Sequence, residues 1–127
     1  MAERARRPRV LLADDSPPMC TAVSALLAAS CDVLATVGNI PALFDAVFTL
    51  KPDVVLLDFS LPGNLDALDV CRCLKRMMPE MHVVALTGHD EPELRKATYA
   101  AGASAFVSKM QAATDLQATI ESVVQGY

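Results

Sequence analysis

The sequence predicts an α/β fold in which five parallel strands alternate with five helices, a doubly wound (βα)5 arrangement. Short apolar runs recur at regular intervals along the 127 residues and are too short to form helices. Between these runs, the apolar residues take the spacing of amphipathic helices. Hydrophobic residues make up 53% of the chain, which suits a sheet covered on both faces. Such alternation implies right-handed crossovers with helices on both sides.

Five apolar runs are expected to form the strands. Most of them are rich in β-branched residues, which favours strands over short buried helices. Turn-forming residues separate the runs from the helices: Pro52 precedes the third strand, Pro79 ends the third helix and Gly102 ends the fourth. The expected strands are residues 10–13, 33–37, 54–57, 83–86 and 105–107.

Helical spacing predicts the elements between the strands. Three segments place apolar residues at i, i+4, i+7 and i+8, and so form one stripe each. A second helix is expected around Leu43 to Leu50, and a fourth after Asp90, which with Glu93 forms a capping box. The three striped sets are Met19, Val23, Leu26 and Leu27; Val70, Leu74, Met77 and Met78; and Leu116, Ile120, Val123 and Val124. Asp66 and Asp69 are expected at the start of the third helix, and Met77 and Met78 in the core.

Composition limits the classes of function. The formal net charge of −4 argues against a general nucleic-acid binder, and we expect the arginines at positions 4, 6, 7 and 9 to form a solvated tail. No apolar run approaches the roughly 18 residues of a membrane span, and no signal peptide opens the chain, so we expect a cytoplasmic protein. The four cysteines lack the spacing of a metal site and are expected to be free.

Polar side chains follow four of the predicted strands at the point where each strand ends. Asp14 and Asp15 follow the first strand, Asp58 the third, Thr87 the fourth and Lys109 the fifth. Ligands of doubly wound sheets bind beyond the carboxyl ends of the strands. We therefore expect these five side chains to gather at one edge of the sheet.

The residue types at this edge indicate phosphoryl transfer. Three neighbouring carboxylates repel one another unless a cation joins them, and oxygen ligands without Cys or His favour Mg²⁺. An aspartate such as Asp58 can act as a nucleophile that forms an acyl phosphate. Lys109 offers a point charge and Thr87 a hydroxyl donor for phosphoryl oxygens, so metal and lysine would screen the developing charge.

Four motifs resemble the response-regulator receiver domain of two-component signalling. LLADDS, KPDVVLLDFSLPG, VVALTG and GASAFVSK occur in the family's order and spacing and cover essentially the whole chain. The resemblance implies a flavodoxin-like sheet of strand order 2-1-3-4-5, and a single receiver domain over residues 1–127 with its core at about 8–125. Met110 replaces the proline common after the lysine. That departure, with KPDVVLLD and GAS, resembles receivers of LuxR-type regulators.

The resemblance also implies a role for each site residue. Asp58 would be the phosphoacceptor, and Asp14 and Asp15 would hold Mg²⁺ with Asp58 and the backbone carbonyl of Ser60. Thr87 would be the switch hydroxyl that moves toward the phosphoryl group, paired with Lys109. Phe106 stands at the position of the family's switch aromatic, without the hydroxyl of the tyrosine often found there. The loop after Asp58 is one residue longer than usual, with Ala67 in place of glycine.

These roles imply a signalling domain that catalyses its own phosphorylation and slow dephosphorylation. The expected partners are a sensor histidine kinase or phosphotransfer protein, and a homodimer. The face around the fourth helix and fifth strand would control an output domain or partner, and we expect an output domain to be missing after Tyr127. DNA would be bound only through such a domain. The alternatives are a pseudo-receiver that binds proteins without phosphorylation, and a small flavodoxin-like ligand-binding or hydrolytic domain.

Overall fold

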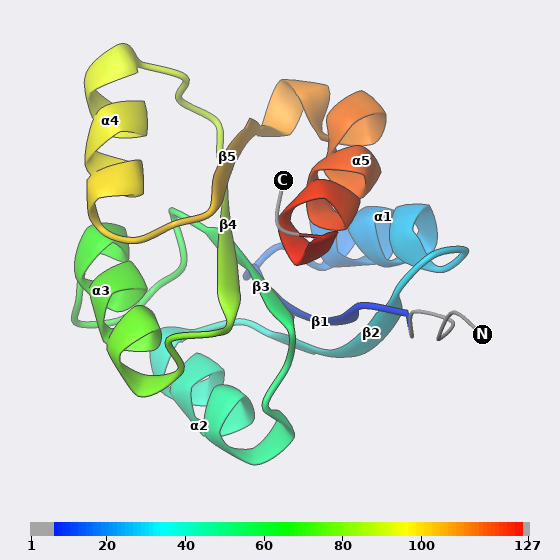
Figure 1. The fold of residues 1–127 in the computed structure, drawn as a ribbon, viewed down its shortest axis with the longest axis horizontal. Coiled ribbons are helices and arrows are strands. Elements are labelled where there is room, and N and C mark those ends of the chain that lie inside the picture. Colours follow the sequence, from blue (N-terminus) through cyan, green and yellow to red (C-terminus); the bar gives the residue numbers. More distant parts are fainter. Residues whose placement is uncertain (1–6, 126–127) are drawn as a thin grey trace.

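The computed structural model describes residues 7–125, and its five strands form one parallel sheet of order β2-β1-β3-β4-β5 (Figure 1). Each of the five predicted runs is a strand, extended by one or two residues, so the predicted fold class and strand order are confirmed. The strands are β1 Arg9–Ala13, β2 Asp32–Val37, β3 Val54–Asp58, β4 His82–Thr87 and β5 Ala105–Ser108.

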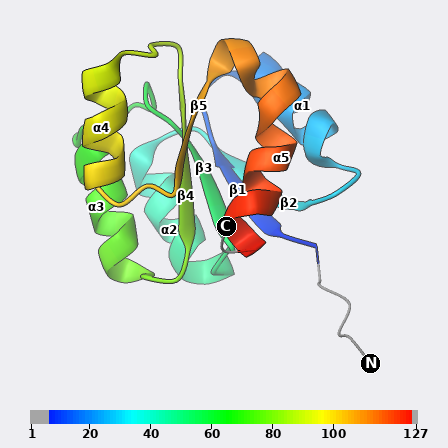
Figure 2. The same cartoon turned by 45° about the horizontal axis from the view of Figure 1, so that its top comes forward.

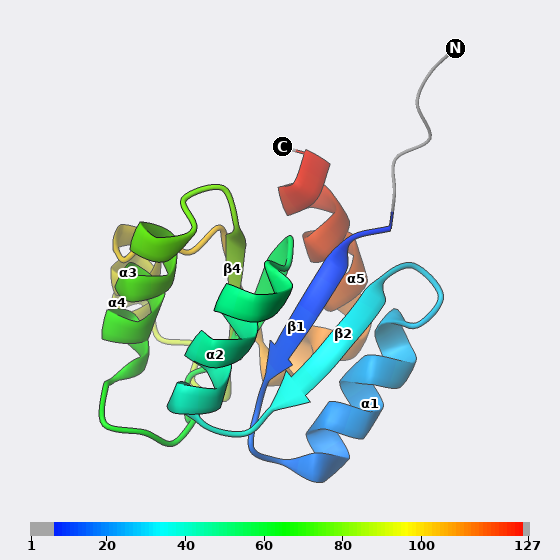
Figure 3. The same cartoon turned by 90° about the horizontal axis from the view of Figure 1, so that it is seen from below.

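Helices cover both faces of the sheet (Figures 1 and 2). Helices α1 and α5 pack on one face, around a core that includes Leu27, Cys31 and Ile120. The other face is covered by α2, α3 and α4, around a core that includes Leu43 and Cys71. The helices are α1 Pro17–Leu27, α2 Ile40–Leu50, α3 Ala67–Met77, α4 Pro92–Ala100 and α5 Ala112–Gln125, and a 3-10 turn, Lys109–Gln111, precedes α5. Viewed from below, β1 and β2 run side by side between α1 and α2 (Figure 3).

Three of the helices begin at a capping side chain that accepts a backbone N–H of the first turn. Ser16 caps α1, Asn39 caps α2 and Asp66 caps α3. Asp66 accepts from the N–H of Asp69 at 2.9 Å, so the predicted start of the third helix is confirmed. Prolines occupy the first turn of α1, where their missing N–H groups cost nothing.

The predicted capping box of Asp90 and Glu93 is wrong. Helix α4 begins at Pro92, its N-cap position is Glu91, and no side chain caps it. Asp90 instead pairs with Arg95, with 2.6 Å between Oδ1 and Nη2. Proline pre-sets the helical backbone angle at the first position, so the helix starts one residue later than the acidic pattern indicates and Asp90 stays in the loop.

Two other predictions fail at the molecular surface. Met77 is 42% exposed and lies outside the core, while Met78 is partly buried against it. Arg7 and Arg9 are not a solvated tail: Arg7 donates to the carbonyls of Ala28 and Cys31, beyond the end of α1, and Arg9 to two carbonyls at the end of α2. Cationic groups at helix C-termini complement the helix dipole. Arg4 and Arg6 lie outside the described residues.

All four cysteines are free, as predicted. Burial raises the pKa of the thiols of Cys31 and Cys71, because a thiolate is poorly solvated inside the protein. Across residues 7–125, every helix is too short or too polar to span a bilayer.

Candidate functional site

The strand register brings the predicted site residues to one edge of the sheet. Asp58 ends β3 opposite Leu86, and Thr87 ends β4 opposite Ser108. Ala13, the last residue of β1, lies opposite Leu57, so Asp14 leaves the sheet level with Asp58. In a parallel sheet these carboxyl ends face the same way, and the side chains that follow them meet.

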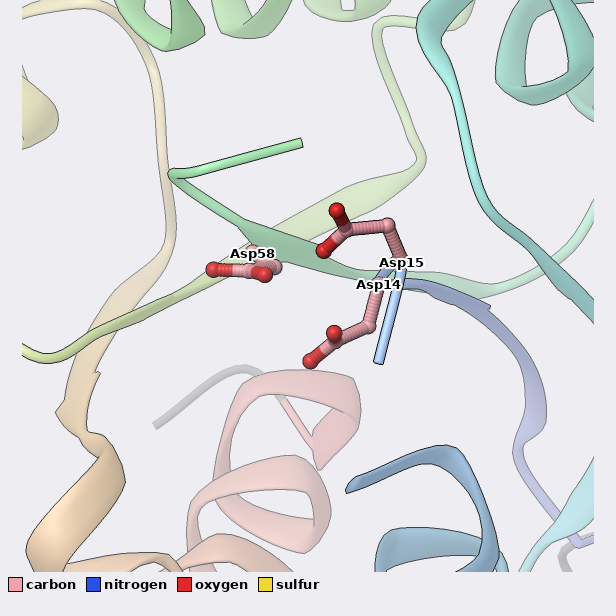
Figure 4. A group of neighbouring side chains, drawn as sticks. All are labelled: Asp14, Asp15 and Asp58. Atoms are coloured by element: carbon pink, nitrogen blue, oxygen red, sulfur yellow. The ribbon is translucent and has the colours of Figure 1, made fainter. Parts of the chain in front are cut away.

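Asp14, Asp15 and Asp58 form an acidic cluster. Each offers a carboxylate oxygen, and these oxygens all lie within 4.8 Å of one another. Figure 4 shows Asp14 and Asp15 reaching from the end of β1 toward Asp58 at the end of β3. Asp14 and Asp58 are each 2% exposed, whereas Asp15 is open to solvent. Two buried carboxylates at this separation call for a positive partner.

Asp14 shows that the cluster fits a cation. Its Oδ1 accepts the N–H of Ser16 at 2.9 Å, but Oδ2 is buried and has no hydrogen-bond partner within the described part of the chain. Burial raises the pKa of Asp14, and the nearby charge of Asp58 raises it further. An unpaired carboxylate oxygen among other oxygen ligands suits a hard divalent ion such as Mg²⁺.

Asp58 has a polar neighbour on each side. Nζ of Lys109 lies 3.0 Å from its Oδ1. The Ser60 hydroxyl lies 3.0 Å from both carboxylate oxygens, and the Ser60 N–H donates to Oδ1 at 3.1 Å. These contacts hold the carboxylate in one orientation while Lys109 offsets its charge. A metal role for the carbonyl of Ser60 stays a prediction.

Thr87 lies with Asp58 and Lys109 on the wall of one cavity of about 620 Å³, whose other walls include Leu68 and Leu94. Its side chain is 3% exposed, and its Oγ1 accepts the N–H of His89 at 3.0 Å. The hydroxyl proton is free of that bond, so Thr87 can donate toward a group in the cavity.

Phe106 is set apart from this cavity. It lies on β5, is 6% exposed, and its ring centroid is 4.7 Å from Cζ of Arg95 on α4. No motif or period in the sequence points to Arg95. Its partners Asp90 and Phe106 are five and eleven residues away, spacings that no helix or strand period would bring together, so only the tertiary fold reveals the contact.

Replacing Asp14 with asparagine should stabilise the metal-free protein. Loss of the charge relieves the cost of burial and the repulsion from Asp58, and we expect a gain of about 1 kcal/mol in the free energy of unfolding. Denaturant unfolding of both proteins with a chelator present, at neutral and at mildly acidic pH, measures it.

The stability gained by Asp14→Asn should become smaller as the pH is lowered. Because the pKa of Asp14 is raised in the folded protein above its ordinary 3.8, the folded state binds this proton more tightly than the unfolded chain. The wild type therefore loses stability as the pH rises from 3.8 through the raised pKa. The variant does not lose this stability, because asparagine has no carboxyl group to ionise. A variant that is less stable than wild type at both pH values would contradict this reading of the cluster.

Fold and site together define a class of protein: the signalling domains built on a doubly wound sheet with a cluster of aspartates at its carboxyl edge. The family described as response regulator receiver domain matches residues 10–121, and the chain belongs to it.

Known proteins agree with this assignment. EvgA of Escherichia coli (strain K12), a DNA-binding transcriptional activator, is 28% identical over 118 residues, which are 92% of this chain and 57% of EvgA. The receiver domain of NarL from Mycobacterium tuberculosis has a TM-score of 0.89 at 25% identity, covering 97% of this chain and 100% of that one. A LuxR-family response regulator from Aurantimonas sp. SI85-9A1 has a TM-score of 0.88 at 23% identity, covering 95% and 87%. The chain thus spans little more than half the length of EvgA.

Proposed function

We propose that this receiver domain is a phosphorylation switch in which Asp58 accepts a phosphoryl group from a sensor histidine kinase or phosphotransfer protein. One observation carries the proposal: the buried Asp58 carboxylate lies 3.0 Å from the Lys109 ammonium and beside the unpaired oxygen of Asp14. A nucleophile, a fixed cation and a set of metal ligands are the parts that phosphoryl transfer needs.

In the transfer, a carboxylate oxygen of Asp58 attacks the phosphorus of phosphohistidine. The new O–P bond gives an acyl phosphate, while the P–N bond breaks and its electron pair leaves with the imidazole. Asp14, Asp15 and Asp58, with the carbonyl of Ser60, would hold Mg²⁺, which when bound neutralises charge on the phosphoryl oxygens. Lys109 pairs with a phosphoryl oxygen once the charge of Asp58 is spread over the acyl phosphate.

The direct test uses purified protein and a small acyl phosphate. With Mg²⁺ present, intact mass spectrometry should show the addition of one phosphoryl group that survives acid and is removed by hydroxylamine, the behaviour of an acyl phosphate. A chelator should suppress the reaction. A protein that stays unmodified under these conditions would favour a pseudo-receiver, which binds partners without phosphorylation.

Replacing Thr87 with alanine should separate phosphorylation from its structural consequence. Asp58 should still be modified, but most of the response at the face formed by α4 and β5 should be lost, because the phosphoryl oxygen gains no hydroxyl donor from β4. Amide chemical shifts of residues 94–106, recorded with and without beryllofluoride as a phosphoryl mimic, measure it. Thr114→Ala, at an exposed threonine on α5, is the control. Shifts as large as in the wild type would refute the coupling.

The output proposed for the switch is control of a partner or of a further domain. EvgA is a DNA-binding activator, and this chain covers 57% of it, so we propose a DNA-binding output joined to the receiver. A homodimer is the assembly that we propose for the receiver, as in the sequence analysis. The acidic receiver itself would then act on DNA only through that output.

A further inference from the structure

We propose that Arg95 is a clasp that joins the loop between β4 and α4 to the ring of Phe106 and holds the domain in its unphosphorylated arrangement. The inference rests on the proposed function, because what the clasp restrains is the change that phosphorylation of Asp58 sets off. It assigns this part to Arg95 and Asp90, which lie outside the acidic cluster and the cavity beside Asp58.

The guanidinium of Arg95 contacts two elements at once. Its Nη2 lies 2.6 Å from Oδ1 of Asp90, in the loop before α4. Its Cζ lies 4.7 Å from the ring centroid of Phe106 on β5, a distance at which a cation is attracted to the face of an aromatic ring. Phe106 is 6% exposed. The half-exposed Arg95 therefore covers the ring and fixes the loop with the same group.

The same loop is also tied to the site. The N–H of His89 donates to Oγ1 of Thr87 at 3.0 Å, and Asp90 is the next residue along the chain. Thr87 therefore holds the loop at one end and Arg95 at the other. When the Thr87 hydroxyl turns toward a phosphoryl oxygen on Asp58, it no longer accepts this N–H in the same geometry, and the ion pair of Asp90 with Arg95 becomes the restraint that remains.

This arrangement predicts whether the clasp strengthens or weakens the binding of a phosphoryl group. Both contacts are present in the unmodified chain, and the clasp acts only if they open in the state that binds a phosphoryl group. Contacts made in the first state alone stabilise it against the second. A ligand binds more weakly when a smaller fraction of the protein molecules is in the binding-competent state. Breaking the clasp should therefore strengthen the binding of beryllofluoride, by about two- to five-fold if a partly exposed cation–π contact is lost.

The experiment titrates beryllofluoride at fixed Mg²⁺ into the wild type and a set of variants, following the amide shifts of Thr87 and His89. Arg95→Gln and Asp90→Asn should each lower the beryllofluoride concentration at the titration midpoint. The double variant should lower this midpoint no further than Arg95→Gln does, because both changes break the same set of contacts. Arg95→Lys should fall between wild type and Arg95→Gln, since it keeps the charge but not the planar group.

Two controls separate a clasp from a general effect of charge. Arg72→Gln removes an arginine whose 2.7 Å ion pair with Asp69 is also about half exposed but lies on α3, and it should leave the midpoint unchanged. In a Phe106→Leu background, which keeps an apolar side chain, Arg95→Gln should lose most of its effect. In the unmodified protein, Arg95→Gln and Asp90→Asn should shift the ring resonances of Phe106.

The outcomes are distinct. A wild type that does not respond to beryllofluoride contradicts the proposed function, and the inference falls with it. A wild type that responds while Arg95→Gln leaves the midpoint unchanged, or raises it, overturns the clasp alone. Effects of Arg95→Gln that persist in full in the Phe106→Leu background also overturn it.

Discussion

Replacing Asp58 with asparagine should abolish covalent phosphorylation of this domain. The amide nitrogen and oxygen of asparagine form no stable acyl phosphate, and the other carboxylates of the site are poor substitutes. Among the described residues, the ion pair of Lys109 is with Asp58, at 3.0 Å. Asp14 and Asp15 therefore lack the neighbouring ammonium that would offset the charge of an acyl phosphate. Intact mass spectrometry after incubation with a small acyl phosphate and Mg²⁺ measures the loss.

A matched control tests whether the loss is specific to this carboxylate. Asp45→Asn removes an exposed carboxylate on α2 and should leave phosphorylation at the wild-type level. Both variants keep the shape of the replaced side chain, so a difference between them reports chemistry and not packing. Equal labelling of Asp58→Asn and wild type would show that another residue is the phosphoacceptor.

Replacing Asp15 with asparagine should weaken Mg²⁺ binding by at least about ten-fold, the lower end of the loss caused by changing even a residue that only supports a metal ligand. Asp15 is the member of the acidic cluster that is open to solvent, so it can be changed with little effect on the core. A hard cation such as Mg²⁺ relies on the charge of its carboxylate ligands. The loss should appear as a weaker dependence of the melting temperature on Mg²⁺.

The reference for this measurement is the protein in excess chelator. Without metal, Asp15→Asn should melt at or above the wild-type temperature, because one repulsive charge has gone. With metal, the order should reverse. Asp45→Asn should follow the wild type under both conditions. If Asp15→Asn and wild type gain equally from Mg²⁺, the acidic cluster is not the binding site.

The sequence was enough to predict the architecture and the edge at which the site lies. Strands of a parallel sheet are buried on both faces, so their apolar runs are visible without knowledge of their neighbours. A polar residue directly after such a run must then lie at the carboxyl edge, which is why Asp58 and Thr87 could be placed from their positions alone. The structure brings both of them to the wall of one cavity with Lys109.

Features that depend on a partner outside the local sequence pattern could not be predicted. Asp90 has the spacing of a capping residue, but Pro92 starts the helix later and the carboxylate pairs with Arg95 instead. Arg7 and Arg9 resemble a charged tail until the ends of α1 and α2 are seen beside them. In each case the residues of the pattern are present, but a partner that the pattern does not include determines which interaction forms.

The free cysteines give the two halves of the core separate chemical reporters. Cys31 is 2% exposed in the core under α1 and α5, and Cys71, on the buried face of α3, is fully buried in the core of the other face. Alkylating reagents attack the thiolate, and burial keeps both thiols protonated and out of reach. Each therefore reacts only when its own layer opens. Pulsed alkylation, read peptide by peptide, would show whether the two layers open together as one cooperative unit or separately.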